Sequence, residues 1–195
     1  MEREYISVVD TAKMIRTALK KAFPGVKFSV VSDKYAGGAS IDVRYLDGPL
    51  AKDVEAVVGP FAGSGFDGMI DLKYSKSSFL LPNGDVVYGG TEGTAGSAGV
   101  VSKEAPELPE GAKVVMFMSD YVFVRRRNSA PAVKAALEHV AKAMGYPEWA
   151  NLEIEAGYDS AYVKDGQKHF LNGAAGSDHW SVDQLVRRHL AGNPL

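Results

Sequence analysis

Apolar residues recur along positions 8–23 with the spacing of one helix face. The apolar positions are Val8, Ala12, Ile15, Leu19 and Phe23, and the opposite face carries Lys13, Arg16, Thr17 and Lys20. Ser7 followed by Asp10 has the form of a capping box, so we expect the helix to begin at Val8. Pro24 disfavours helical geometry at Phe23, and Gly25 lets the chain turn. The pattern predicts an amphipathic helix with a basic outer face.

Two segments with alternating hydrophobicity follow this helix. The apolar positions are Val26, Phe28 and Val30 in the first segment, and Ile41, Val43 and Tyr45 in the second. Alternation with period two predicts half-buried strands, which we expect to pair antiparallel with the first helix on one face. The connection from Asp33 to Ala39 contains Gly37-Gly38. We interpret it as a wide hairpin loop, and the alternative is a loop that approaches a ligand.

A second helix is predicted after Asp47-Gly48-Pro49, with Asp47 or Gly48 as N-cap and Pro49 in the first turn. Gly59-Pro60 ends it. Residues 63–68 then match the pattern G-x-G-x-x-G, but a dinucleotide site needs this motif after a strand and before a helix. Here it follows a helix and precedes a predicted strand at residues 69–74. We therefore interpret it as a connecting loop.

The remaining elements are predicted from turn and cap signals. Residues 79–88 read as a hairpin that turns at Asn83-Gly84, and residues 113–118 and 121–125 as strands buried on both faces that complete the sheet. Ser129 caps a third helix that ends at Gly145, and two strands follow at 152–156 and 160–163. A capping box at Ser181 opens the last helix.

These elements predict an α+β fold. We expect a mainly antiparallel sheet of five to seven strands, with helices on one face and a C-terminal helix at one edge. Residues 89–102 contain five glycines, which predicts a linker or insertion between two halves. The predicted domains are residues 1–88, a Gly/Pro-rich connection at 89–111, and a second α+β half at 112–195. The order helix, strand, strand, helix occurs twice, which leaves an internal duplication open.

Composition narrows the class of protein. The 195 residues are 46% hydrophobic, include no cysteine, and carry a net charge of −2. No apolar run approaches the roughly 18 residues of a membrane span, so we expect a cytoplasmic protein of the bacterial cell with no membrane partner. Without cysteine there is no disulfide, thiol nucleophile or thiolate metal ligand. Attraction to a nucleic acid has to come from local patches of charge.

No residue set has the spacing of a catalytic or metal site. The four histidines do not form an HExxH pair, and the G-x-S-x-G and Walker A motifs are absent. The nearest approach to an acid–base cluster is Asp178-His179 with Asp183 and His189, which we interpret as surface residues. Glu153 and Glu155 lie on one face of a strand and are expected to face solvent. We predict no catalytic residue, cofactor or metal, and an unrecognised enzyme is the third hypothesis for function.

A set of short motifs resembles a known family. They are Ala12-Lys13 with Arg16 and Leu19, Ala22-Phe23-Pro24-Gly25, Lys27-Phe28-Ser29-Val30, Ser32-Asp33-Lys34-Tyr35, Gly37-Gly38-Ala39-Ser40, Val43, Asp47-Gly48-Pro49, and Phe66-Asp67-Gly68-Met69 with Asp71. Together they resemble the large polyvalent protein-associated domain of the type numbered 29, over about residues 5–75. A weaker echo returns at residues 120–124. The resemblance implies a phage or plasmid context and supplies no catalytic motif.

The first functional hypothesis is a non-catalytic binding protein that antagonises a host defence system, of the anti-CRISPR or anti-restriction type. Its partner would be a host protein or ribonucleoprotein complex. The alternative is an accessory module that binds DNA or RNA through a basic surface. The candidate partner-binding residues are Lys13, Arg16, Lys20, Lys34, Tyr35, Arg125, Arg126 and Arg127. The pattern leaves the oligomeric state open.

Overall fold

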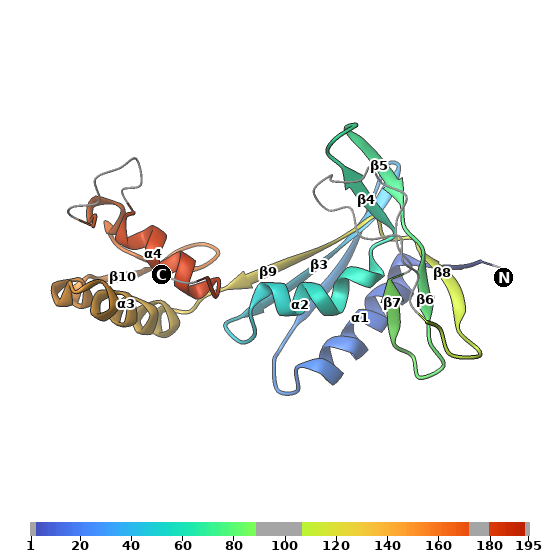
Figure 1. Cartoon of the computed structure of the whole chain (residues 1–195), viewed down its shortest axis with the longest axis horizontal. Helices are drawn as coiled ribbons and strands as arrows, with labels where there is room; N and C mark the ends of the chain where they lie inside the picture. Colours follow the sequence, from blue (N-terminus) through green and yellow to red (C-terminus); the bar gives the residue numbers. More distant parts are fainter. Residues whose placement is uncertain (1–2, 89–106, 172–179, 194–195) are drawn as a thin grey trace. The chain divides into compact units, whose positions relative to one another are not determined.

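The computed structural model describes residues 3–88, 107–171 and 180–193 (Figure 1). The predicted linker at residues 89–102 lies outside these ranges. The α-helices of the described ranges are α1 (Val8–Ala22), α2 (Ala51–Val58), α3 (Ala130–Met144) and α4 (Val182–Leu190). The short 3₁₀ helices are η1 (Gly59–Phe61), η2 (Pro147–Asn151) and η3 (Gly166–Lys168).

The described strands form four separate sheets. One has the order β1–β8–β6–β7, with β1 (Glu4–Ile6), β8 (Lys113–Phe117), β6 (Ser78–Leu80) and β7 (Val86–Tyr88). A second has the order β2–β3–β9, with β2 (Ser29–Tyr35), β3 (Gly38–Leu46) and β9 (Tyr121–Arg127). The two-stranded sheets pair β4 (Ser64–Asp67) with β5 (Leu72–Ser75), and β10 (Ile154–Ala156) with β11 (Ala161–Val163).

The α+β class is confirmed, with a C-terminal helix and mostly antiparallel pairing. The expectation of one sheet of five to seven strands is wrong. The two strands predicted at 113–118 and 121–125 belong to different sheets, because the chain changes direction at Ser119-Asp120. The hydroxyl of Ser119 is buried and donates to the carbonyl of Phe61 at 2.9 Å. A local pattern of hydrophobicity does not reveal which sheet a strand joins.

The chain divides into two compact units. Unit 1 comprises Met1–Arg44 and Lys52–Arg125, and unit 2 comprises Tyr45–Ala51 and Arg126–Leu195. The strands β3 and β9 each run from unit 1 into unit 2. Each unit is described separately below.

In unit 1, helix α1 packs on one face of the sheet β2–β3–β9. Helix and sheet meet through fully buried side chains, among them Ile15 and Leu19 of α1 and Ile41 and Val43 of β3. Figure 1 shows α1 and α2 on one side of β3 and β9. The predicted buried stripe of α1 is therefore confirmed, except that Phe23 at its end is half-buried and packs against Phe28 with ring centroids 6.0 Å apart.

The β2–β3 hairpin is antiparallel as predicted, but its loop is shorter than expected. Tyr35 pairs with Gly38, so only Ala36 and Gly37 lie between the strands. Gly37 has a φ of 87°, which a two-residue turn requires and which glycine adopts without strain. The wide loop predicted from Asp33 to Ala39 is thus replaced by longer strands.

Helix α2 begins at Ala51, later than the predicted start at Pro49. Asp47 and Gly48 have φ values of 54° and 71°, so they form a left-handed turn and cap no helix. The carboxylate of Asp47 instead accepts the backbone N–H of Ser129 at 2.9 Å. A contact distant in sequence therefore overrides the local helix-start signal.

The strand predicted at residues 69–74 is shifted along the chain. Residues 68–71 form a turn, and β5 begins at Leu72. The side chain of Asp67, which is buried, accepts the backbone N–H of Met69 at 3.0 Å and so closes the turn locally. The prediction of a connecting loop for the glycine-rich motif at residues 63–68 is wrong, because Ser64–Asp67 form the strand β4 that pairs with β5.

Strand β9 is not buried on both faces as predicted. Phe123 and Arg125 are exposed, and the other residues of β9 are half-buried. In β8, Val115 and Phe117 are buried while Val114 and Met116 are half-buried. A run of apolar residues therefore indicates a strand here without indicating that both faces are covered.

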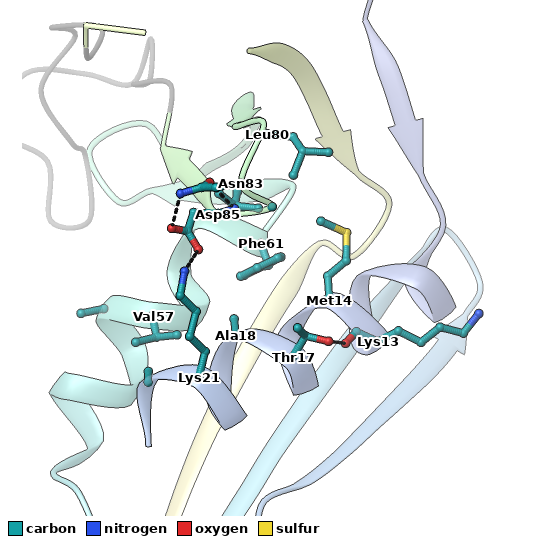
Figure 2. Close-up of a pocket in the computed structure, with 14 residues that line it drawn as sticks. Lys13, Met14, Thr17, Ala18, Lys21, Val57, Phe61, Leu80, Asn83 and Asp85 are labelled. Carbon is teal, nitrogen blue, oxygen red and sulfur yellow. Dashed lines mark hydrogen bonds and ion pairs between the residues drawn. The ribbon is translucent and has the colours of Figure 1, made fainter. Parts of the chain in front are cut away.

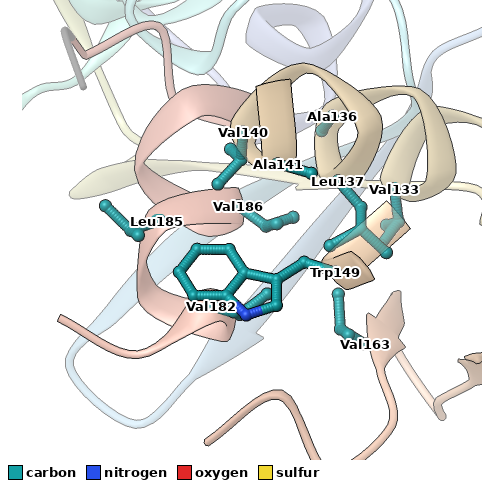
Figure 3. Packing of buried hydrophobic residues seen from close by; sticks show 10 residues of the cluster. All are labelled: Val133, Ala136, Leu137, Val140, Ala141, Trp149, Val163, Val182, Leu185 and Val186. Carbon is teal, nitrogen blue, oxygen red and sulfur yellow. The ribbon is translucent and has the colours of Figure 1, made fainter. Parts of the chain in front are cut away.

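Unit 2 has its own hydrophobic core, centred on Trp149 (Figure 3). Figure 3 shows the indole of Trp149 between side chains of α3 and α4, among them Leu137 and Val186. Tyr146 stacks on Trp149 with ring centroids 4.3 Å apart. The predicted caps are confirmed: Ser129 accepts from the N–H of Ala132, Gly145 ends α3 in the left-handed region, and Ser181 with Gln184 forms a capping box.

We predict that Ile15→Ala destabilises unit 1 by about 2 to 5 kcal/mol, because it removes fully buried atoms and leaves a cavity. The matched control is Val9→Ala on the same helix, which removes an exposed side chain and should change the free energy of unfolding by about 0.5 kcal/mol or less. Urea unfolding followed by circular dichroism measures both. Equal effects of the two substitutions would contradict the packing of α1 on the sheet.

Candidate binding surfaces

The hairpin formed by β4 and β5 carries an exposed group of large apolar side chains. Met69 is 66% exposed, Leu72 59%, Ile70 55% and Phe66 48%. All four fall within seven consecutive residues, around a turn that contains Gly68 and Asp71. We call these four residues the apolar tip. Scattered exposed apolar side chains are ordinary, but four large ones near the end of one hairpin mark a candidate contact surface.

The base of this hairpin is held by the carboxylate of Asp120. It accepts hydrogen bonds from the hydroxyl of Ser64 at 3.0 Å, the ammonium of Lys73 at 2.8 Å and the hydroxyl of Tyr35 at 3.2 Å. These donors come from β4, β5 and β2, so a single carboxylate joins three strands. We call these four residues the Asp120 cluster. It fixes the direction in which the hairpin leaves the rest of unit 1.

The pKa values of the Asp120 cluster reflect these bonds. Burial raises the pKa of Asp120, but donation by Lys73 and Ser64 outweighs burial, so the pKa lies below its ordinary value. The same contact raises the pKa of Lys73. Burial and the hydrogen bond to Asp120 raise the pKa of Tyr35, in that order. At neutral pH the cluster therefore holds a carboxylate, an ammonium and a neutral phenol.

Two glycines allow the close packing around this cluster. A Cβ on Gly38 would lie 2.0 Å from a carboxylate oxygen of Asp120, and a Cβ on Gly63 would lie 1.8 Å from the carbonyl oxygen of Phe117. Neither position tolerates a side chain without movement of its neighbours. Gly38, the second glycine of the pair that sequence analysis assigned to a wide loop, thus makes room for the Asp120 carboxylate.

A groove of about 810 Å³ lies between α1, α2 and the β6–β7 hairpin (Figure 2). Its apolar lining includes Met14, Val57 and Phe61. The charged groups at the rim are paired within the chain, since Lys21 binds Asp85 at 2.7 Å. Figure 2 shows this ion pair across one end of the groove, with Asn83 also donating to Asp85. The groove offers shape and apolar surface with few polar groups to orient a ligand.

The predicted basic face of α1 is exposed, but two of its three cations have partners. Lys13 forms an ion pair with Asp10 at 2.8 Å, and Arg16 donates to the carbonyl of Val30 at 2.6 Å. Lys20 is exposed. Lys34 is also exposed, next to the β2–β3 turn. The structure therefore places these four predicted residues at the surface of unit 1.

The three consecutive arginines of β9 contact three different parts of the chain. Arg125 binds the carboxylate of Asp42 at 2.6 Å. Arg126 donates to the backbone carbonyls of Leu190 and Gly48, which stabilises the start and end of unit 2. Arg127 binds Asp159 at 2.9 Å. Sequence analysis read them as one positive cluster, and the structure shows that each guanidinium is already engaged.

Two histidines that are distant in sequence meet in unit 2. His139 of α3 and His189 of α4 stack with ring centroids 4.3 Å apart and an angle of 15° between the rings. Burial, and then the charge of His139, lower the pKa of His189. Sequence analysis considered His189 with Asp178-His179, which lie outside the described residues. Sequence analysis did not identify His139 as the neighbour of His189, because positions on two helices become neighbours only through tertiary packing.

One lysine binds two glutamates, Glu155 in β10 and Glu153 directly before it. Lys164 contacts Glu153 and Glu155, each at 3.0 Å, which raises the pKa of Lys164. The hydroxyl of Tyr162 donates to Glu155 at 2.6 Å, and this bond is the largest cause of the lowered pKa of Glu155. A general acid needs a raised carboxyl pKa, and the lowered pKa of Glu155 is the opposite of this.

Within the described ranges, no group of three or more His, Asp or Glu side chains is arranged to hold a metal ion. None of the helices in that part of the chain combines the length and apolar character needed to cross a bilayer. The surfaces that remain as candidates are the apolar tip and the outer face of the sheet β2–β3–β9.

We predict that the Asp120 cluster makes stability depend on pH in acid. Since the folded-state pKa of Asp120 is lowered, its contribution is present above the ordinary pKa of 3.8 and is lost as pH falls through the folded-state pKa. The difference in free energy of unfolding between the parent and Asp120→Asn should therefore shrink below pH ~4. Urea titrations at several pH values measure it. A difference that is constant across this range would contradict the predicted ionisation.

We predict that His139→Gln raises the pKa of His189 but leaves it below the ordinary value of 6.5, because burial is the larger cause of the shift. Nuclear magnetic resonance titration of the imidazole signals reports this pKa directly. The neutral form of His189 is favoured in the folded state, so unit 2 should lose stability as pH falls below 6.5, and His189→Gln should weaken that loss. A pKa of His189 at or above 6.5 in the parent would contradict the burial of this imidazole beside His139.

The family model of the large polyvalent protein associated domain 29 matches residues 6–129. The match extends beyond the expected residues 5–75, through β9 and up to the N-cap of α3. No curated protein and no solved structure shows significant similarity to the chain. Because the match spans more than half of the chain, the protein belongs to the large polyvalent protein associated domain 29 family, a family of phage- and mobile-element-associated domains.

Proposed function

We propose that this protein is a non-catalytic binding protein of a mobile element that occupies the surface of a host protein, and that the target belongs to a host defence system such as CRISPR or restriction. The observation that carries the proposal is the apolar tip of the β4–β5 hairpin, whose four large side chains are 48–66% exposed. Membership of a mobile-element-associated family supplies the cellular context.

The apolar tip has the composition of the centre of a protein–protein interface. Its side chains, a phenyl ring, a thioether and two branched chains, bury large apolar areas when a partner covers them. Polar residues surround them, since Asp71 lies in the turn and Lys73 follows in β5. Apolar anchors within a polar rim are the arrangement in which a few residues supply most of the binding energy.

The hairpin is also pre-organised. Asp120 ties β4 and β5 to β2, and Asp67 fixes the turn through the N–H of Met69. A rigid projection loses less conformational entropy on binding than a flexible loop would. We expect these bonds to restrict the conformations of the apolar tip.

Two other functions have less support. An enzyme would need a cluster of reactive side chains, and the described residues include no such metal-binding group, while Glu153 and Glu155 are neutralised by Lys164. A binder that works through the basic face of α1 would compete with the ion pair between Lys13 and Asp10. Binding through the basic face of α1 stays a prediction.

The test is a double substitution of the apolar tip, Met69→Asp with Ile70→Asp. Both side chains are exposed, so the free energy of unfolding should change by about 0.5 kcal/mol or less. Capture of a specific host protein by the tagged chain, from a lysate of cells with intact defence systems, should be lost. Inhibition of restriction or CRISPR interference against a challenge phage should be lost with it.

The control is Tyr158→Asp, which places one aspartate, against two in the double variant, at a fully exposed position of unit 2 and should leave both readouts unchanged. A folded double variant that captures the same protein and still protects the phage would refute the apolar tip as the contact. A parent chain that protects no phage against any defence system would refute the choice of target. Light scattering over a range of concentrations identifies a second copy of the chain as the occupant, in which case the double variant becomes monomeric.

A further inference from the structure

The sheet β2–β3–β9 has one face packed on α1 and a second face that carries aromatic and arginine side chains. Alternation along β3 puts Asp42 and Arg44 on this outer face, because Ile41 and Val43 between them point into the core. Arg125 binds Asp42, so it lies on the same face, and Phe123 lies there two residues earlier on β9. The outer face is thus defined by residues of unit 1 alone.

The aromatic side chains of β9 form a short row along the strand. Tyr121 and Phe123 are separated by one residue, and their ring centroids are 6.0 Å apart with an angle of 30° between the planes. Phe123 is 44% exposed, which is unusual for a phenylalanine on the middle part of a sheet strand. On the edge strand β2, Val31 is exposed opposite Asp42, and Tyr35 ends the strand.

Two guanidinium groups stand beside this row. Arg125 lies 5.9 Å from the ring centroid of Phe123, and its Nε is 2.6 Å from Asp42. Arg44 contacts the other oxygen of Asp42 at 3.2 Å. The two arginines share one carboxylate, so this group keeps one net positive charge. Asp33 lies further along β2, at the edge of the same face.

We infer that the outer face of the sheet β2–β3–β9 binds single-stranded nucleic acid, with unpaired bases stacked on Phe123 and Tyr121 and the backbone phosphates bound by Arg125 and Arg44. Aromatic rings on an open sheet face accept bases of any sequence, since every base has a flat π surface. Arginine suits the phosphates because its planar fork can donate two hydrogen bonds to one phosphate. The carboxylate of Asp42 holds both guanidinium groups in place and competes with the phosphate for them.

This site is independent of the apolar tip. It uses β3 and β9 where the proposed protein contact uses the turn between β4 and β5, so the two surfaces can fail separately. Net charge does not drive the binding, since the whole chain carries −2. Stacking is expected to supply the larger share, and the two guanidiniums to give a modest salt dependence.

The experiment measures fluorescence polarisation with two labelled probes, a twelve-nucleotide oligothymidylate and a twelve-nucleotide oligouridylate, at ~50 mM salt and above. We expect the parent to bind at least one probe. Phe123→Ala should weaken binding roughly 5- to 100-fold by loss of stacking on one base, and Phe123→Trp should retain it. The difference between the two probes distinguishes DNA from RNA as the ligand.

The matched control is Phe66→Ala, which removes a phenyl ring of similar exposure from the apolar tip, 48% against 44%, and should change binding less than twofold. Asp42→Asn provides a second test. It frees both guanidiniums from the competing carboxylate, so binding should become several-fold tighter. If Asp42 and the two arginines served only to stabilise the fold, Asp42→Asn would not bind the probes more tightly than the parent.

Three results would overturn the inference. The first is no binding of either probe by the folded parent at ~50 mM salt, where phosphate contacts are strongest. The second is Phe123→Ala binding as tightly as the parent. The third is loss of host protein capture in Phe123→Ala without any binding of the probes, which would make the outer face a protein interface. The double substitution of the apolar tip, which should leave polarisation unchanged, shows whether the two sites are separate.

Discussion

Burial of one face of β3 under α1 is the constraint on which unit 1 depends. Ile15 and Leu19 of α1 and Ile41 and Val43 of β3 are almost fully buried, and removal of such apolar side chains from water is the main favourable contribution to folding. Because side chains alternate across a strand, the same packing commits Asp42 and Arg44 to the opposite face. The composition of the outer face is therefore a consequence of how the core is made.

A second, polar constraint sets the direction of the β4–β5 hairpin. Asp120 directly follows Ser119, which is buried and bonded to the carbonyl of Phe61. The backbone therefore sets the position of the Asp120 carboxylate independently of the side chains that bind it. Its backbone N–H donates to the carbonyl of Ala39 at 2.7 Å, which joins β9 to β3, while its side chain binds Lys73 at 2.8 Å. One residue thus links sheet pairing to hairpin orientation. A hydrogen-bonded carboxylate of this kind specifies geometry more than it adds stability.

Local signals in the sequence predicted the elements well and their assembly less well. Caps at Ser129 and Ser181, the stripe of α1 and the turn at Asn83-Gly84 each depend on residues a few positions apart, and the structure confirms them. The division into several sheets, the contact of Asp47 with Ser129 and the stacking of His139 on His189 depend on residues about 50 or more positions apart. A local pattern of hydrophobic and polar residues does not indicate which distant residues come into contact. Sequence analysis missed the apolar tip for another reason. A hydrophobic run predicts a strand equally well whether its side chains are buried or exposed.

The distribution of charge decides how such a chain can recognise a partner. Most cations that sequence analysis picked out are bound within the chain: Lys13 to Asp10, Arg125 to Asp42, and Arg127 to Asp159. An ion pair between exposed groups contributes little to stability, yet the paired carboxylate weakens the long-range attraction of its cation for phosphates. Long-range attraction to a polyanion is therefore weak, and contact has to come from flat or apolar side chains at short range. Phe123 with Tyr121, and the four side chains of the apolar tip, are among the described groups of unit 1 that meet this requirement.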